Sequence, residues 1–146
     1  VPGDKVDIQV ELKGFGSENK SDVAMLVPAD GVEGVKNAVL EIVKHAGPNP
    51  CPPIVLGIGI GGTMDQAAVM SKALLRDISV PHKDADYAKL EEEIMEMVNK
   101  TGIGPQLGGT TTCIGVNIEW GATHIAGLPV AVTIMCHAAR HAHVVL

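Results

Sequence analysis

Apolar residues recur with two different periods along the chain, and these periods predict where strands and helices lie. Alternation at every second position predicts a strand over residues 5–13 that is half-buried on its apolar face. Apolar runs predict buried strands over 54–60 and 129–135, and another strand is predicted over 111–119. Residues 23–27 fit either a short strand or a helical turn. Predicted strands are therefore spread over the whole length of the chain.

Apolar residues spaced three and four apart predict a helix over residues 32–46. Asp30 stands where a helix cap is expected, and Glu33 follows it at the spacing of a capping box. Gly47 comes just after the last apolar position, where a glycine ends many helices. This segment therefore has a predicted start, an apolar face and an end.

Two more helices are predicted in the middle of the chain. One begins at about Thr63 and runs to Arg76, and the other spans residues 87–99 after a cap at Asp84 or Asp86. The second helix carries an acidic face that we expect to be solvated, formed by Glu91, Glu92, Glu93 and Glu96. Strands interleaved with three to four helices predict a single compact domain of the α+β or α/β class.

The composition agrees with one small hydrophobic core. The chain has 146 residues, enough for one core and too few for two comfortable domains. Hydrophobic residues make up 46% of it, yet it holds only one Trp, one Tyr and one Phe. Aliphatic side chains and methionines must therefore fill the interior.

Charge and cysteine content exclude several classes of function. The net charge is −6, without a basic stripe, so we expect no nucleic-acid partner. We also expect no membrane association, because no apolar run is long enough to cross a bilayer. Three cysteines without a framework spacing suit a reducing compartment, so we expect a cytoplasmic protein.

A glycine-rich segment at residues 57–62, GIGIGG, allows three interpretations. It contains a formal G-x-G-x-x-G, and residues 78–80 with Asp84 would supply the second strand and ribose acid of a dinucleotide site. Against this, its first glycine lies inside the apolar run rather than after it. The second interpretation is a tight strand-to-helix turn with close backbone packing. In the third, N–H groups near Thr63 face an anion.

Two of the three cysteines lie at the ends of predicted strands. Cys51 precedes one apolar run within the segment GPNPCPP, and Cys136 ends another and opens the segment CHAARH. A thiol at the end of a buried strand, flanked by rigid or polar chain, suits a metal ligand. The alternative is that both are ordinary buried thiols.

Further motifs narrow the interpretation. They are KGFGSEN at 13–19, TGIGPQLGGTTT at 101–112 and THIAGLPVAV at 123–132, besides the glycine-rich and cysteine segments. Together they resemble the alpha region of the oxygen-sensitive iron–sulfur hydro-lyases, the class I fumarate hydratases and L(+)-tartrate dehydratases. The resemblance runs from about residue 1 to residue 143. We expect residues 1–146 to be the C-terminal part of that region, with its N-terminal part absent from this chain.

The resemblance implies an activity and a cofactor. Reversible hydration of fumarate to malate is the leading activity, L(+)-tartrate dehydration is the alternative, and a nucleotide-binding or assembly module is the competing class. In the family, three cysteines hold a [4Fe-4S] cluster whose fourth iron is open to substrate. Cys51 and Cys136 match two of these ligands, and the third belongs to the missing N-terminal segment. Cys113 is expected to be a thiol of the strand core.

The resemblance also implies the residues of a substrate site. His124 matches an active-site histidine of the family, and Gly14, Gly16 and Ser17 match a loop whose amides approach the substrate. Gln106 matches a second substrate-binding loop, where this chain lacks one glycine that family members have. These five residues are the expected catalytic and substrate-binding groups.

Three polar residues follow the second cysteine. His137, Arg140 and His141 are expected to donate hydrogen bonds to cluster sulfurs or to a carboxylate around the ligands. An equally favoured interpretation makes them the polar face of a C-terminal helix.

The chain itself is poor in groups that bind a dicarboxylate. It has two arginines, Arg76 and Arg140, too few to clamp both ends of a C4-dicarboxylate. In the family a separate beta subunit or domain supplies basic residues and the catalytic base. We therefore expect a beta partner, a homo- or hetero-oligomer, and no hydro-lyase activity from this chain alone.

Overall fold

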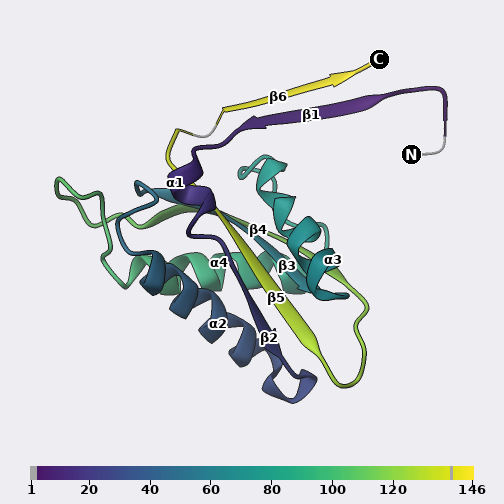
Figure 1. Ribbon diagram of the computed structural model, residues 1–146, viewed down its shortest axis with the longest axis horizontal. Helices are drawn as coiled ribbons and strands as arrows, with labels where there is room; N and C mark the ends of the chain where they lie inside the picture. Colours follow the sequence, from purple (N-terminus) through teal and green to yellow (C-terminus); the bar gives the residue numbers. More distant parts are fainter. Residues whose placement is uncertain (1–2, 139) are drawn as a thin grey trace.

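The computed structural model describes residues 3–138 and 140–146, and it has the predicted α+β architecture (Figure 1). Four strands form the main sheet in the order β2–β5–β3–β4, with a separate two-stranded ribbon made of β1 and β6. The main strands are β2 (Asp22–Leu26), β5 (Leu128–Met135), β3 (Ile54–Gly61) and β4 (Cys113–Gly121). The ribbon strands are β1 (Asp7–Leu12) and β6 (Arg140–Val145).

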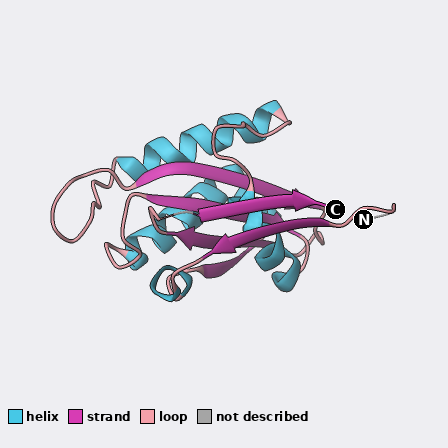
Figure 2. Cartoon of the chain, turned by 90° about the horizontal axis from the view of Figure 1, so that it is seen from above, coloured by secondary structure: helices cyan, strands magenta, loops and turns pink. Residues whose placement is uncertain are grey.

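Helices cover both faces of the main sheet (Figure 2). One face packs against α2 (Gly31–Ala46) and α4 (Ala85–Asn99). The other face packs against α3 (Met64–Met70), which continues as the 3-10 helix η2 (Ser71–Leu75). Two short elements complete the fold, α1 (Phe15–Glu18) and η1 (Pro28–Asp30). The sheet is thus the middle layer of three.

Strand β3 lies at the centre of the sheet and is buried along its whole length. Its isoleucines and Leu56 belong to the main core, with Val39 of α2 and Ile94 of α4 in the same cluster. Its other face carries Gly57 and Gly59. A Cβ at Gly57 would overlap the carbonyl oxygen of Ser71, and one at Gly59 would overlap that of Ala67. Glycine is therefore required where α3 and η2 lie directly on the strand.

The register of β3 fixes two edges of the sheet. Its start pairs with the start of β4, since Ile54 lies opposite Cys113 in a parallel ladder. It also pairs with the end of β5, since Val55 lies opposite Met135 in an antiparallel ladder. Loops 47–53, 100–112 and 136–138 therefore meet at one edge, which we call the cysteine edge. Loops 62–63 and 122–127 lie at the opposite edge.

Most predicted elements are confirmed, and the segment that fitted either a strand or a helical turn over 23–27 is the strand β2, Asp22–Leu26. The predicted capping box at the start of α2 is wrong, because the Asp30 carboxylate instead accepts from the Val27 amide at 2.9 Å. The helix predicted from Thr63 to Arg76 changes to 3-10 geometry at Ser71. The C-terminal helix considered for the residues after Cys136 is also wrong, because a strand pairs there with β1.

The prediction that the first strand is half-buried is also wrong. Ile8, Val10 and Leu12 alternate along β1, Val6 directly precedes it, and these four side chains are 38 to 57% exposed. The reason is that β1 pairs with β6 alone, and among the described residues nothing covers this side of the ribbon. Alternation correctly predicted a strand, but it did not show what the apolar face packs against.

The expected solvation of the acidic face on α4 is wrong at one position. Glu91 is buried, and its carboxylate forms an ion pair with Arg76. It also accepts from the backbone amides of Ile118 at 2.8 Å and His82 at 3.1 Å. These bonds tie α4 to β4 and to the loop before α4.

Candidate functional site

Both cysteines predicted as metal ligands lie at the cysteine edge. Cys51 precedes β3 and Cys136 directly follows β5, and the antiparallel pairing of these strands brings the two ends together. Cys51 is exposed and Cys136 is half-buried. The two residues are 85 positions apart in sequence, so the sheet register unites them.

Cys51 has an unusual backbone conformation. Its φ is +58°, in the left-handed region, and it is the only non-glycine residue with positive φ in the described parts of the chain. Its amide donates to the Pro48 carbonyl at 3.2 Å, which closes a tight turn. Such a conformation costs a non-glycine residue about 1–3 kcal/mol and persists where surrounding contacts determine it. Strained residues of this kind gather at functional sites.

His137 joins the two cysteine segments. Its ring Nδ1 lies 3.1 Å from the carbonyl oxygen of Cys51, and its backbone amide donates to the same oxygen at 3.4 Å. A carbonyl oxygen only accepts, so Nδ1 carries a proton in this contact. The residue after Cys136 therefore holds the backbone of Cys51.

Cys113 lies at the same edge but in a different environment. It is 2% exposed at the start of β4, and its thiol donates to the Gly115 carbonyl at 3.2 Å. Burial raises its pKa to about 11. Without a metal, a thiol with this pKa stays protonated at neutral pH. This environment supports the expectation that Cys113 is a thiol of the strand core.

The donor set at this edge suits part of a cluster site. Two accessible thiols from separate loops lie at neighbouring strand ends, and cysteine thiolates are the usual ligands of an iron–sulfur cluster. Within residues 3–138 and 140–146, no three His, Cys, Asp or Glu side chains are grouped closely enough to hold a metal ion. Cys51 and Cys136 would fit as two of the ligands of such a cluster.

The glycine–serine loop contains the short helix α1, which contacts β5. Ser17 is buried, and its hydroxyl donates to the Gly14 carbonyl at 2.8 Å while accepting from Lys13 Nζ at 3.2 Å. The Ser17 side chain is thus engaged within its own loop. By contrast, added Cβ atoms at Gly14 and Gly16 would meet nothing within 4 Å. A ligand would therefore meet the backbone of this loop rather than the Ser17 side chain.

The second predicted substrate loop also reaches the cysteine edge. Gln106 is exposed in the 100–112 loop, which leads from α4 into β4. The base of this loop is fixed by Asn99, whose amide oxygen accepts from the amides of Thr112 at 3.0 Å and Cys113 at 2.9 Å. Figure 1 shows the loop extending away from the sheet beside the 47–53 loop.

His124 is not brought to the cysteines. It is exposed in loop 122–127, at the opposite edge, before β5 begins. Eight residues of β5 separate this loop from Cys136, a span of roughly 26 Å at the usual strand rise. Its ring Nδ1 accepts from the Ala126 amide at 3.1 Å, which places the proton of a neutral ring on Nε2.

Arg140 and His141 lie in the ribbon. Arg140 pairs with Leu12, and His141 pairs with Glu11, whose carboxylate lies 4.0 Å from its Nε2. The Glu11 side chain is 8% exposed, and burial raises its pKa. Their role around the cysteines remains a prediction, since they begin a strand that leads away from that edge.

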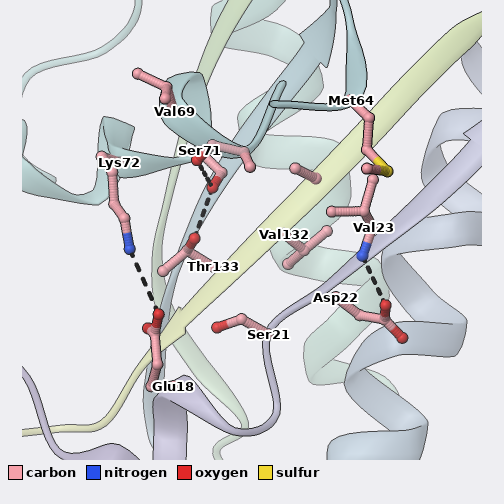
Figure 3. A pocket seen from close by; sticks show the side chains of 12 residues that line it. Glu18, Ser21, Asp22, Val23, Met64, Val69, Ser71, Lys72, Val132 and Thr133 are labelled. Carbon is pink, nitrogen blue, oxygen red and sulfur yellow. Dashed lines mark hydrogen bonds and ion pairs between the residues drawn. The ribbon is translucent and has the colours of Figure 1, made fainter. Parts of the chain in front are cut away.

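An open cavity of about 700 Å³ lies beside the glycine–serine loop, on the sheet face next to α3 (Figure 3). The Ser71 and Thr133 hydroxyls are hydrogen-bonded at 2.6 Å in its lining. At one end Lys72 lies 3.8 Å from Glu18, whose pKa is lowered by its hydrogen bond to Lys13. Sequence periodicity does not reveal this cavity, because its lining comes from three separate segments, 18–23, 64–72 and 131–133.

The glycine-rich segment has a packing role in this structure. Its first two glycines lie inside β3 under α3 and η2, and they do not form a loop after the strand. At its end the Thr63 amide donates to the side chain of Gln66 at 3.0 Å, so that amide is engaged. This geometry supports the close-packing interpretation and removes the reason for the dinucleotide one.

Comparisons with known proteins agree on one family. The family model described as fumarate hydratase (Fumerase) matches residues 1–145. A putative L(+)-tartrate dehydratase subunit alpha of Methanocaldococcus jannaschii is 50% identical over 145 residues, 95% of this chain and 51% of that protein. The L(+)-tartrate dehydratase subunit alpha of Escherichia coli K12 is 39% identical over 139 residues, 94% of this chain and 46% of that protein. The chain thus spans about half the length of these relatives.

Proposed function

The chain belongs to the fumarate hydratase (Fumerase) family, and we propose that it forms part of the active site of an iron–sulfur hydro-lyase. The observation that carries the proposal is the meeting of Cys51 and Cys136 at one edge of the sheet, with a core thiol beside them. The described residues contain no helix that is long and apolar enough to cross a membrane.

Cys51 and Cys136 would hold a [4Fe-4S] cluster together with a third cysteine from outside residues 1–146. When bound, the cluster supplies an open iron that acts as a Lewis acid toward a substrate hydroxyl group. The chain's own contribution is to place two thiols from different loops on a rigid sheet edge. The backbone of the Gly14–Ser17 loop and Gln106 would bind the substrate near this edge.

The substrate is proposed to be a C4-dicarboxylate. The family description favours fumarate hydration to malate, and the names of the two relatives favour L(+)-tartrate dehydration. Both reactions add or eliminate water, and in both the C–O bond that forms or breaks is at a carbon next to a carboxylate. One site chemistry therefore serves either activity.

The active site is completed by other polypeptide segments. The relatives are alpha subunits by name, and we propose a beta partner that supplies the catalytic base and further cationic groups. His124 lies at the far end of β5, so it acts beside Cys51 only if a second copy of the chain supplies it. The proposed enzyme is therefore an oligomer with shared sites.

A chimera tests this proposal. Residues 1–145 would replace the matching half of the M. jannaschii alpha subunit, which would be produced anaerobically with a beta subunit and supplied with iron and sulfide. Fumarate hydration and L-tartrate dehydration would then be measured separately. Either activity, abolished by Cys51→Ser and restored with wild-type sequence, supports the proposal and identifies the substrate. A chimera that binds a cluster but acts on neither compound contradicts the proposed reaction.

A further inference from the structure

We propose that His137 is a positioning residue that holds Cys51 in its left-handed conformation and thereby sets the relation between the two thiols. The inference deepens the proposed function, because it concerns how the suggested cluster ligands are placed. It differs from the sequence-based expectation, in which His137 donates to a cluster sulfur or to a carboxylate.

The contact itself is specific. Two donors of one residue, the ring Nδ1 and the backbone amide of His137, meet the same carbonyl oxygen of Cys51. His137 directly follows Cys136 in the sequence, so these hydrogen bonds join the two cysteine segments next to both cysteines. A change at this contact therefore affects the placement of both thiols.

The backbone of Cys51 explains why such a contact is needed. A φ of +58° is sterically unfavourable for cysteine, because it has a Cβ atom, whereas glycine adopts this conformation readily. The side-chain direction of a residue depends on its backbone angles, so relaxation of Cys51 would redirect its thiol. The hydrogen bond from the Cys51 amide to the Pro48 carbonyl holds one peptide group of Cys51. The hydrogen bonds from His137 to the Cys51 carbonyl hold the other.

The surroundings make His137 the main side-chain support at this point. Among the residues that the structure describes, the Cys51 thiol has only one long hydrogen bond, of 3.9 Å, to the carbonyl of Asn49. Both Cys51 and His137 are exposed, so core packing does not restrain either side chain. The hydrogen bonds from His137 therefore carry the restraint across the two loops.

The test begins with the cluster-free chain and dibromobimane, which becomes fluorescent when it bridges two thiols. We expect rapid bridging of Cys51 and Cys136 in the wild type and none in Cys51→Ser. His137→Ala should bridge at least threefold more slowly. His137→Asn retains a short side-chain donor and should recover most of the rate. His45→Ala, which alters a histidine on α2, is the matched control and should leave it unchanged.

A second measurement follows iron loss to a chelator from the cluster-loaded chimera, with a faster loss expected for His137→Ala than for His137→Asn. Equal bridging rates for wild type and His137→Ala would overturn the inference. So would an equal slowing by His137→Ala and His137→Asn, since the hydrogen bond would then not matter. A chimera that takes up no cluster, with bridging still dependent on His137, would contradict the proposed function and leave the positioning role standing.

Discussion

At the scale of single residues, the three cysteines differ mainly in their access to water. Cys51 is exposed, Cys136 is half-buried and Cys113 is 2% exposed. Burial also keeps Cys113 in the thiol form, because its charged form would lose hydration inside the sheet. The chain therefore separates two accessible thiols from one structural thiol at the same edge.

This difference predicts selective alkylation of the cluster-free chain. At pH 8 iodoacetamide should modify Cys51 first and leave Cys113 unmodified, since a pKa of about 11 leaves roughly one thiolate in a thousand. The intrinsic reactivity of Cys113 should rise about tenfold per pH unit toward its pKa. Peptide mass spectrometry over time would measure each site. Equal rates at Cys51 and Cys113 in the folded chain would refute the assignment.

Among the residues of α4, Glu91 is the one whose substitution we expect to lower the free energy of unfolding most. Glu91→Ala would leave Arg76 without its buried carboxylate partner and the amide of Ile118 without its acceptor. We expect a loss of about 3 kcal/mol in the free energy of unfolding, measured by urea denaturation. Glu92→Ala, at the next and exposed position, is the control and should change it by less than about 0.5 kcal/mol. Similar effects of both substitutions would show that the Arg76 pair is unimportant.

At the scale of elements, the sequence of the central strand β3 matches the helices that pack on its two faces. One face of β3 presents large aliphatic side chains to α2 and α4, and the other presents glycines to α3 and η2. Side chains on the second face would separate the helical layer from the sheet. The glycine pattern of this segment is therefore a packing device.

Gly59→Ala tests this packing. The added methyl group would overlap the backbone of α3 at Ala67, so the helix must move away from β3. We expect a destabilisation of about 3 kcal/mol, seen as a lower thermal midpoint by circular dichroism. At Gly127 an added Cβ meets nothing within 4 Å, so Gly127→Ala is the matched control. A Gly59→Ala variant as stable as this control would contradict the close approach of α3.

The elements were largely predictable from sequence, because their signals are local. Hydrophobic periodicity predicted the core strands and α2, and α2 ends before Gly47 as expected. Burial of Glu91 was not predictable, because it depends on Arg76 from another element. The surroundings of β1 depend on its distant partner β6. The meeting of Cys51 and Cys136 followed from family resemblance, and only the sheet register gives it a geometric basis.

At the scale of the whole molecule, the two edges of the sheet carry different parts of the proposed site. Cys51 and Cys136 lie at one edge and His124 lies at the other, separated by the length of β5. A rigid, buried sheet does not bend to bring them together. A site that uses all three residues therefore needs two chains.

Complementation between inactive variants tests this arrangement. Cys51→Ser and His124→Ala alpha chains of the chimera should each be inactive alone. When they are produced together, a mixed dimer has one site with both wild-type residues, so about a quarter of wild-type activity should return. Steady-state hydro-lyase assays with both substrates would measure it. No recovery, with mixed dimers shown to be present, would place His124 outside the shared site.

The central claim is that Cys51 and Cys136 hold a cluster and Cys113 does not. The most direct measurement is the thiolate-to-iron charge-transfer absorption, with bound iron and sulfide, of the anaerobically reconstituted chimera. We predict a full cluster in the wild type and in Cys113→Ser, and loss of stable binding in Cys51→Ser and Cys136→Ser. A cluster that depends on Cys113, or one that survives both of the other substitutions, would contradict the account.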